Sequence, residues 1–563
     1  MPPLRNASQT VDYVVIGSGF GGSISTMRLA KKGYEVILLE RGKRFRDEDF
    51  PNSNWRVWKY LWAPALRCFG ILQISFFRNV LVLHGSGVGG GSLGYANVLM
   101  EPSDEMFRNP QWSHLADWKP ILRPHYDMAK KMLGVTSNPR LSPADQTLRQ
   151  IAAEMGQEAT FRPTTGGVYY GEPGKDAPDP YFGGEGPSRT GCIHCGGCMI
   201  GCRHNAKNTL PKNYLYFAEK WGAKIWAETE VGDIRPLPPN QSDGARYEVI
   251  YRSSTNPLSL RRGRIRARNV IVSAGALGTM RLLFRCRDVT QSLPRLSRRL
   301  GEMVRTNSEA LLGSTNRTLN TDWSKGIAIT SIFNADSVTT IEPVRYPNGS
   351  SLMRFLSGPL IKPGTSIPMR IARSIFEIVT HPLDFMKVHL LPGWAKRSTI
   401  LLVMQTEDNR LKMRLGRGLF TGYRRNLLSA PDGEYTPPTA VEIGHKVTRA
   451  FAQKTNAVPL GSINEGLFNI PLTAHILGGV PFGKDENEGV IDLKCEVFNY
   501  PGLFVIDGSI MPANPGVNPS LTIAALSEYA MSQVPVKPGK TEIPAAFDAP
   551  FQTVIPLEAA PKS

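Results

Sequence analysis

Short apolar runs alternate with a glycine-rich turn in the N-terminal part of the chain. Residues 11–16 are mostly apolar and β-branched, 17–22 are rich in glycine, and 23–32 repeat apolar side chains at helical spacing. Gly33 is placed to end that helix, and a second apolar strand follows at 35–40. This order of strand, turn, helix and strand predicts a βαβ unit and therefore a parallel sheet.

Further along, the pattern predicts another buried strand and then a mostly β segment. Residues 269–274 form a short apolar run, and a helical pattern follows from about Leu277. From 307 to about 456, alternating positions and turn residues predict strands, with 400–405 as a central one. Beyond Pro535 the chain is rich in proline, so we expect it to run over the surface.

The composition is that of a large globular protein with a substantial core. The 563 residues are 41% hydrophobic and 20% charged, which excludes a disordered or fibrous chain. No apolar run approaches the roughly 20 residues that span a membrane, and the first apolar run is too short for a signal peptide. We therefore expect a cytoplasmic protein.

Basic residues exceed acidic ones, 66 against 48, so the formal net charge is +18. Many of them lie in two stretches: Arg261, Arg262, Arg264, Arg266 and Arg268, and Arg410, Lys412, Arg414, Arg417, Arg424 and Arg425. The first stretch alternates as one face of an exposed strand does. No nucleic-acid-binding signature accompanies either stretch, so we expect no nucleic acid as a partner. A solvated basic face is the first interpretation, and attraction to a membrane surface is the second.

The turn at 17–22 fits the G-x-G-x-x-G pattern of dinucleotide-binding sites. Its first glycine permits the tight turn, its second lets a pyrophosphate approach the backbone, and its last allows the helix to pack closely on the strand. The predicted cofactor contacts of this turn are Gly17, Gly19, Phe20, Gly21 and Gly22. Glu40 ends the second strand, where a carboxylate can accept hydrogen bonds from ribose hydroxyls.

Further motifs identify a family. A second glycine-rich run, Gly85-Ser86-Gly87-Val88-Gly89-Gly90-Gly91-Ser92, would let the backbone lie against another part of a long, flat cofactor. The other motifs are Val272-Ser273-Ala274-Gly275-Ala276-Leu277-Gly278-Thr279, Ala474-His475-Ile476-Leu477-Gly478-Gly479, and Val505-Ile506-Asp507-Gly508-Ser509 continuing to Gly516-Val517-Asn518-Pro519. With these motifs the chain resembles the glucose–methanol–choline (GMC) family of FAD oxidoreductases, and within it the cholesterol-oxidase-like branch. The resemblance covers most of the chain, including 80–100, 190–215 and 467–526.

The resemblance implies an α/β fold with FAD as the cofactor. A Rossmann-like FAD-binding domain, at 10–100, 205–306 and 461–535, would be interleaved with a substrate domain built on a mainly antiparallel β-sheet with helices. That domain would occupy 307–460, with a cap segment carrying the cysteines at 101–204 and a surface tail at 536–563. The implied cofactor contacts beyond the first turn and Glu40 are Gly87, Gly91, Ser92, Asn97, Val231, Ala274, Gly275, Asp507, Gly508, Asn518 and Pro519.

Two residues are candidates for alcohol oxidation, which requires removal of the hydroxyl proton as the hydride leaves. A neutral imidazole suits that role, because the ordinary pKa of imidazole lies near the operating pH. His475 precedes a Gly-Gly turn, and Asn518 can orient a substrate oxygen. By resemblance they match the family's catalytic histidine and asparagine. The resemblance also makes Glu342 a candidate proton carrier for double-bond isomerisation, with an ordinary strand-end carboxylate as the alternative.

Four of the seven cysteines lie close together, at Cys192, Cys195, Cys198 and Cys202. Their C-x2-C-x2-C-x3-C spacing matches the bacterial ferredoxin run, which binds an iron–sulfur cluster, although Arg203 replaces the proline of that run. Zinc, disulfides and four free thiols are the alternatives. The resembling branch carries a similar segment in proteins described as plain flavoproteins. We favour a metal cluster, which would pass electrons to an external carrier.

Large apolar side chains gather at 55–77 and again at 371–394. Core packing explains most of them, but any exposed part would form an apolar entrance for a lipid at a membrane surface. We therefore expect oxidation of a bulky apolar, sterol-like alcohol to a ketone or aldehyde, with oxygen or a redox protein as electron acceptor. The alternatives are a non-redox flavin-dependent lyase or isomerase of the same fold, and a lipid-binding or electron-relay flavoprotein.

Overall fold

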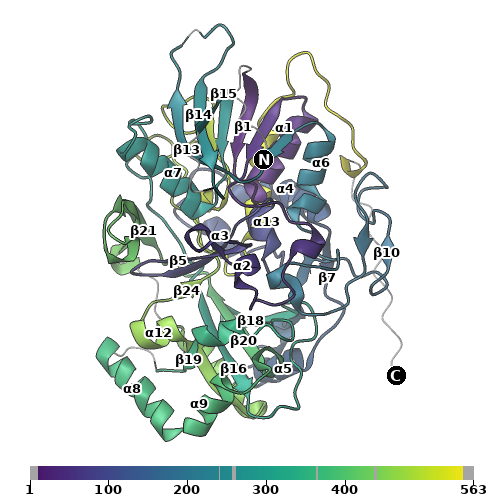
Figure 1. Ribbon diagram of the computed structural model, residues 1–563, viewed down its shortest axis with the longest axis vertical. Coiled ribbons are helices and arrows are strands. Elements are labelled where there is room, and N and C mark those ends of the chain that lie inside the picture. The colour runs from purple at the N-terminus through teal and green to yellow at the C-terminus, as the bar shows by residue number, and fades with distance from the viewer. Residues whose placement is uncertain (1–9, 240, 257–261, 363–365, 436–439, 549–563) are drawn as a thin grey trace.

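The computed structural model describes residues 10–239, 241–256, 262–362, 366–435 and 440–548. Two seven-stranded sheets organise them, one in the upper and one in the lower part of Figure 1. The first sheet has the order β12-β2-β1-β15-β14-β13, and β25 pairs with β15. Its strands are β1 (Val11–Ile16), β2 (Val36–Leu39), β12 (Lys224–Trp226), β13 (Thr229–Pro236), β14 (Tyr247–Ser253), β15 (Arg262–Val272) and β25 (Leu503–Val505).

The βαβ unit predicted at the N-terminus is confirmed. Strand β1 runs parallel to β2 on one side and to β15 on the other. Between β1 and β2, helix α1 (Phe20–Lys31) is buried along its whole length. It begins earlier than the predicted residue 23, because the last glycines of the turn are themselves helical. Gly33, at a φ of +83°, follows the end of the helix as predicted.

The predicted strand at 269–274 is the end of a longer strand, β15, whose first half carries the arginine-rich stretch. Exposed or half-buried arginines alternate there with buried residues. The ion pairs they form are Arg264–Glu248, Arg266–Asp243 and Arg268–Asp12. The described part of the stretch is therefore a solvated, ion-paired strand face, which agrees with the first interpretation of its positive charge. Arg261 lies outside the described residues.

The second sheet has the order β19-β23-β16-β20-β18-β17-β8, and all its neighbouring strands pair antiparallel. Its strands are β8 (Arg162–Pro163), β16 (Ala310–Asn316), β17 (Ser331–Asn334), β18 (Thr339–Val344), β19 (Ser357–Pro359), β20 (Ser398–Gln405) and β23 (Ala457–Ser462). The central strand β20 contains the strand predicted at 400–405. The antiparallel sheet implied for the substrate domain is confirmed.

The prediction that 307–456 is mostly β missed several helices. They are α8 (Ile367–Thr380), α9 (Pro382–His389), α10 (Trp394–Arg397) and α11 (Glu442–Lys454). Pro368 and Pro382 lie in the first turns of α8 and α9, where a missing N–H costs the helix nothing. Helix α11 packs against β16, β20 and β23, whereas α8 and α9 project from the lower end of the molecule (Figure 1).

A small sheet joins the start of the second glycine-rich run to the C-terminal part of the chain. It contains β5 (Leu72–Phe76), β6 (Leu81–Gly85) and β24 (Leu472–Thr473), in the order β24-β6-β5. Because β24 pairs in parallel with β6, the segment that begins at Ala474 starts beside the second glycine-rich run.

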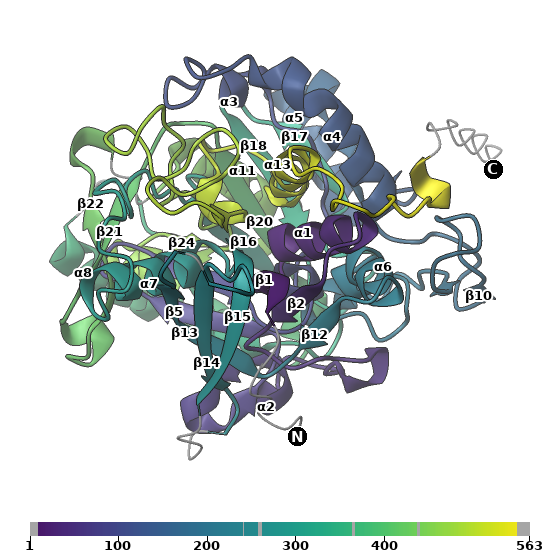
Figure 2. The same cartoon turned by 90° about the horizontal axis from the view of Figure 1, so that it is seen from above.

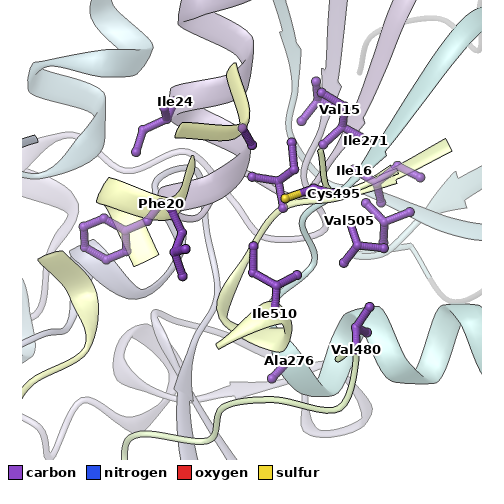
Figure 3. Close-up of a cluster of buried hydrophobic side chains, with 14 of the residues drawn as sticks. Val15, Ile16, Phe20, Ile24, Ile271, Ala276, Val480, Cys495, Val505 and Ile510 are labelled. Carbon is purple, nitrogen blue, oxygen red and sulfur yellow. The ribbon is translucent and has the colours of Figure 1, made fainter. Parts of the chain in front are cut away.

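The core next to the first sheet contains segments from both ends of the chain. Figure 3 shows Val15 and Ile16 of β1 near Ile271 of β15 and Val505 of β25, and all four belong to one buried cluster. The helices around this sheet include α4 (Trp118–Leu133), α6 (Tyr214–Lys220), α7 (Ala276–Asp288) and α13 (Ser520–Ser532). Helix α1 packs against α6 and α13 (Figure 2). Because β1, β15 and β25 are parallel neighbours, the loops that follow them meet at one edge.

The C-terminal segment is more than a surface tail. The N–H of Lys537 donates to the Lys32 carbonyl, the N–H of Ile543 donates to the Lys31 carbonyl, and Phe547 is buried. Residues 549–563 of the predicted tail lie outside the described residues. In the part of the chain that the structure describes, no helix is both long and apolar enough to cross a bilayer.

Candidate functional site

A cavity of about 760 Å³ lies where residues of the two sheets meet. Its volume is within the range of about 300–1,000 Å³ that is typical of ligand sites. Most of the predicted site residues line it: Gly17, Gly19, Phe20, Gly21, Glu40, Gly91, Val231, Ala274, Gly275, His475, Asp507, Gly508, Asn518 and Pro519. The other predicted cofactor and catalytic residues, Gly22, Gly87, Ser92, Asn97 and Glu342, are not part of this lining, and neither are the four clustered cysteines.

Glycines of the first turn touch the loops after β15 and β25. Gly17 has a φ of +99°, and a Cβ on it would lie 2.2 Å from the oxygen of Ser273. A Cβ on Gly21 would lie 1.8 Å from the oxygen of Ile506, and one on Gly22 would lie 1.9 Å from the oxygen of Gly17. No side chain fits at these distances. The tight turn and the close packing predicted for Gly17 and Gly22 are therefore present.

Three other glycines face open space. Among the described residues, a Cβ on Gly19, Gly91 or Gly275 would meet no heavy atom within 4 Å, and all three glycines line the cavity. Gly19 also precedes the first turn of α1, whose unpaired N–H groups make a helix N-terminus attractive to phosphate. These positions fit a phosphate-bearing dinucleotide cofactor that approaches the backbone closely.

The carboxylate of Glu40 fixes the first turn as well as lining the cavity. Its Oε2 accepts hydrogen bonds from the N–H of Ser18 at 3.0 Å and from the Ser18 hydroxyl at 2.7 Å. Its Oε1 accepts one from the N–H of Gly42 at 2.7 Å. A carboxylate offers about four acceptor positions, so Glu40 retains capacity for a ribose hydroxyl. The sequence motif indicated only the ribose contact.

Asp507 links the loop after β25 to the loop after β15. Its Oδ2 accepts a hydrogen bond from the N–H of Gly275 at 2.9 Å, and its Oδ1 accepts one from the N–H of Ser509 at 2.8 Å. Burial raises the pKa of Asp507, and these hydrogen bonds oppose the rise. Two predicted cofactor residues, Asp507 and Gly275, are thus in direct contact at the cavity wall.

Three predicted cofactor residues that do not line the cavity lie in or near the second glycine-rich run. They are Gly87, Ser92 and Asn97. The carbonyl of Gly87 accepts a hydrogen bond from the Ser18 hydroxyl at 3.2 Å, which connects the two glycine-rich turns. The hydroxyl of Ser92 donates to the carbonyl of Gly89 at 2.7 Å. Asn97 is buried with a φ of +73°, and within the described chain neither polar atom of its side chain has a hydrogen-bond partner.

Two half-buried arginines on the cavity wall were not predicted from the sequence. Arg41 donates to Oε1 of Gln73 at 2.6 Å, and Arg281 of α7 donates to Oδ1 of Asn426 at 3.0 Å. Burial lowers the pKa of Arg281 to about 10, and the positive charge of Arg41 adds to this effect. Two poorly solvated cations on one wall favour an anionic ligand group such as a diphosphate. Arg41 directly follows Glu40 in the sequence, but only the fold brings Arg281 to the same wall.

His475 lies just after β24, with 14% of its side chain exposed, and Glu309 stands beside it. The Nδ1 of His475 is 3.1 Å from Oε2 of Glu309, whose side chain is fully buried. That oxygen also accepts hydrogen bonds from the Thr473 hydroxyl at 2.7 Å and from the N–H of Ala474 at 3.0 Å. Nδ1 has no well-aligned hydrogen bond to any described residue, so the ring must turn slightly to donate to Glu309.

Glu309 determines which nitrogen of His475 can act as a base. A carboxylate only accepts hydrogen bonds, so its position favours the tautomer with the proton on Nδ1 and leaves Nε2 as the acceptor. Glu309 was not predicted from the sequence, because it directly precedes the strand β16 and resembles an ordinary strand-end residue. The sequence feature that could have indicated Glu309 was a single acidic residue directly before the apolar residues Ala310–Leu312.

Glu342 of β18 is fully buried next to Asn518. Burial raises the pKa of Glu342 to about 8; Asn518 opposes the rise, and the charge of Glu309 adds to it. Neither oxygen of Glu342, nor Oδ1 of Asn518, has a well-aligned hydrogen bond within the described chain. The structure thus brings the three predicted catalytic residues into one region together with Glu309.

The wall formed by the second sheet and its neighbours is apolar. Glu342 pairs with Leu402 across β18 and β20, and Leu402 lines the cavity. The large apolar residues of this wall are Leu72, Leu83, Val98, Met199, Leu311, Ile329, Val344, Tyr346, Ile400 and Leu402. The polar groups of His475 and Asn518 therefore face a space that suits a bulky apolar molecule.

The structure does not support an iron–sulfur cluster or zinc at Cys192, Cys195, Cys198 and Cys202. Among the described residues, no three or more His, Cys, Asp or Glu side chains are placed to hold a metal ion. All four cysteines are free, so disulfides are not present either. Burial raises the pKa of Cys192 to about 12 and that of Cys198 to about 11. Ferredoxin-like spacing alone did not determine how the thiols are arranged in space.

The segment that carries these cysteines has a structural role. Lys207 is buried and donates to the carbonyls of Leu93, Tyr95 and Cys198 at 3.0, 2.8 and 2.9 Å. It therefore connects the cysteine segment to the end of the second glycine-rich run.

Sequence comparison finds relatives along nearly the whole chain. A family model described as GMC oxidoreductase matches residues 446–527. A cholesterol oxidase of Acinetobacter baumannii is 44% identical over 535 residues, which are 93% of this chain and 94% of that protein. A cholesterol oxidase of Mycobacterium tuberculosis is 45% identical over 564 residues, covering 98% of this chain and 95% of that protein.

More distant proteins share the fold. A long-chain-alcohol oxidase of Arabidopsis thaliana is 24% identical over 557 residues, covering 93% of this chain and 67% of that protein. The crystal structure of pyridoxine 4-oxidase from Mesorbium loti aligns with a TM-score of 0.62 at 14% identity, covering 93% of this chain and 99% of that one. The implied α/β fold class is therefore confirmed.

Proposed function

Because the chain belongs to the GMC family of FAD-dependent oxidoreductases, which act on CH–OH groups, we propose that it oxidises a bulky, sterol-like alcohol to a ketone or aldehyde. The observation that carries the proposal is the position of His475, Asn518 and Glu309 beside an apolar cavity wall. The two relatives with 44% and 45% identity are both named cholesterol oxidases, which supports a sterol-like substrate.

The glycine-rich loops would hold the cofactor. Gly19, Gly91 and Gly275 leave open space for it, Glu40 retains acceptor capacity, and Arg41 would balance diphosphate charge. FAD, when bound, accepts the hydride that leaves the alcohol carbon. The proposal includes the division into FAD-binding parts at 10–100, 205–306 and 461–535, with a substrate domain at 307–460.

His475 takes the hydroxyl proton at Nε2 in this proposal. Glu309 keeps the other ring proton on Nδ1 and stabilises the imidazolium that forms, because its carboxylate lies 3.1 Å from that nitrogen. Thr473 and Ala474 hold Glu309 in place through hydrogen bonds to the same oxygen. His475 is thus the catalytic base, and Glu309 is a positioning residue.

Asn518 and Glu342 would also act on the substrate. Asn518 lines the cavity with an unpaired Oδ1 and would orient the substrate oxygen through its amide group. Glu342 would carry a proton between ring carbons of a ketone product and so move a double bond. Glu342 does not line the cavity itself but lies next to Asn518, which does. This position, and the lack of a well-aligned hydrogen bond to either Glu342 oxygen among the described residues, support the role.

We propose molecular oxygen as the electron acceptor rather than a redox protein. The two relatives with 44% and 45% identity are named oxidases, and the thiols of the cysteine segment are not placed to hold a relay cluster. The proposal predicts oxygen consumption with one hydrogen peroxide formed per alcohol oxidised.

An anaerobic titration tests the function. Addition of a sterol should bleach the flavin absorbance, and His475→Ala should abolish bleaching while FAD stays bound. A flavin that stays oxidised with every sterol and long-chain alcohol would refute the proposal. Conversion of substrate without flavin reduction would favour a lyase or isomerase, and tight lipid binding without either would favour a binding or relay protein.

A further inference from the structure

Helices α8 and α9 carry an exposed apolar surface at the lower end of the molecule (Figure 1). Its main side chains are Ile375, Phe376, Val379, Leu383, Met386 and Leu390. Each of these is between 50% and 70% exposed. A group of this size on neighbouring helices is uncommon on a protein surface that faces only water.

The polarity of α8 is inverted relative to a normal surface helix. Its buried residues are Arg370 and Ser374, four residues apart and hence on one face. Ile375, Phe376 and Val379 point away from the protein body. A helix that covers a core in water buries its apolar face instead. The outer face of α8 is therefore suited to an apolar environment outside the protein.

Aromatic and basic groups lie in and beside the 3-10 turn Leu352–Leu356, which contacts α9. Trp55 and Phe355 are exposed, and their rings make an edge contact with centroids 5.8 Å apart. The Arg354 guanidinium lies 5.1 Å from the centroid of the Phe355 ring. Amphipathic aromatic rings and basic residues are typical of the interface between lipid tails and headgroups.

The charge of α8 and α9 is basic once internal pairs are considered. Asp384 pairs with Arg317 at 2.7 Å. Glu377 lies 3.4 Å from Nδ1 of His381, so its charge is partly offset when that ring is protonated. Arg373 is exposed and Lys387 is half-buried. Together with the net charge of +18, this arrangement complements anionic headgroups.

A second cavity of about 80 Å³ adjoins the large cavity, and part of its lining comes from a turn that contacts α9. Met353 and Leu356 line it from the 3-10 turn that contacts α9, and Trp394 lines it from the start of α10. It shares Leu83, Leu311, Tyr346 and Ile400 with the large cavity. Rotation of these shared side chains would join the two spaces into one apolar passage.

We propose that α8 and α9 dock on a phospholipid bilayer with anionic headgroups, and that the apolar substrate passes from the bilayer through the second cavity to His475. The identity of the substrate rests on the proposed function, but the docking surface does not depend on it. The exposed apolar side chains enter the headgroup region, and Arg373 and Lys387 contact lipid phosphates.

Vesicle sedimentation tests the docking without relying on catalysis. The holoenzyme should sediment with phosphatidylcholine vesicles that contain phosphatidylglycerol, and the double variant Phe376→Asp/Leu383→Asp should bind them about tenfold or more weakly. The matched control is Leu141→Asp. Leu141 is an exposed leucine just before α5 (Pro143–Glu154), and α5 lies on a different side of the molecule from α8 (Figure 2). Equal binding by wild type and double variant overturns the proposal. A wild-type dimer that the double variant dissociates, without vesicle binding by either, overturns it in favour of a contact between copies.

Flavin reduction distinguishes failure of the docking from failure of the proposed function. With sterol in detergent micelles, the double variant should reduce its flavin at the wild-type rate; with sterol in vesicles, it should be slower by the factor lost in binding. No reduction of any variant in micelles refutes the proposed function and leaves the sedimentation result standing. Leu356→Trp, which fills the second cavity, should slow reduction by sterol without changing sedimentation, and an unchanged rate overturns the passage.

Discussion

Replacement of Glu309 by glutamine tests whether the buried carboxylate positions His475. Glutamine has nearly the same shape and keeps a side-chain oxygen, so Glu309→Gln can retain the hydrogen bonds from the Thr473 hydroxyl and the Ala474 N–H. It removes the negative charge that lies 3.1 Å from Nδ1 of His475. The variant therefore separates the effect of the Glu309 charge on the His475 tautomer from the effect of side-chain packing.

The expected magnitude follows from this distance. Unit charges 3.1 Å apart interact by about 5 kcal/mol at an effective dielectric constant of about 20, which is an upper bound. Because glutamine still offers an acceptor, the loss should be that of a charge-assisted hydrogen bond, about 1.5–3 kcal/mol. If this interaction free energy is lost only in the transition state, the rate of flavin reduction falls about 10- to 150-fold and substrate affinity changes little.

Anaerobic stopped-flow measurement of flavin absorbance gives this rate directly. Glu465→Gln is the matched control, because Glu465 lies 3.1 Å from Nε2 of His445 in another buried pair, with side chains 5% and 1% exposed. The control should keep the wild-type rate of flavin reduction and lose stability comparably. If Glu309→Gln reduces its flavin as fast as wild type, or if both variants slow equally, Glu309 does not position the base.

Three further predictions concern stability, cofactor and metal. Glu342 has a folded pKa of about 8 against an ordinary value of 4.5, so the folded state keeps a proton that the unfolded chain loses. Wild-type stability should therefore fall relative to Glu342→Gln from about pH 5 to about pH 8, by at most about 1.4 kcal/mol per pH unit, and parallel curves of Tm against pH would contradict this. Gly19→Ala should lower the FAD bound per chain with little change in the Tm of the apoprotein, whereas Gly22→Ala should lower the Tm itself, since its Cβ would lie 1.9 Å from the oxygen of Gly17; the opposite pattern would contradict the assignment of open and packed glycines. Protein purified anaerobically should contain far less than one iron atom per chain, and Cys198→Ser should keep the wild-type rate of flavin reduction; stoichiometric iron and acid-labile sulfide would show that the cysteines form a cluster after all.

Local sequence rules predicted the N-terminal unit well. Strand β1, the glycine turn and the end of α1 follow from residues that are neighbours in sequence, and Gly33 stops the helix through its own φ. Helices α8 and α9 were missed because their outward apolar faces do not pack on a core, so core-based patterning misread them.

The sequence predicted the site residues that lie in recognisable motifs. It missed those that only the tertiary structure brings to the site. His475 and Asn518 lie in recognisable segments, and both line the cavity. Glu309 and Arg281 lie outside any motif that distinguishes them from ordinary charged residues. The cysteine run shows the opposite error, because its spacing matched a cluster motif while the folded segment does not bring the thiols together as ligands.

By itself, the sequence determined the dinucleotide turn, the family resemblance and the candidate base, because each depends on residue types at fixed short spacing. Only the tertiary structure decided which residues from distant parts of the chain meet at the site. Parallel pairing of β15 with β1 and β25 brings Gly17, Ser273 and Ile506 to one edge. Packing of the antiparallel sheet places Glu309 beside His475 and buries Glu342. Contacts and burial of this kind join residues far apart in the chain, and they set the charge, tautomer and shape of the site.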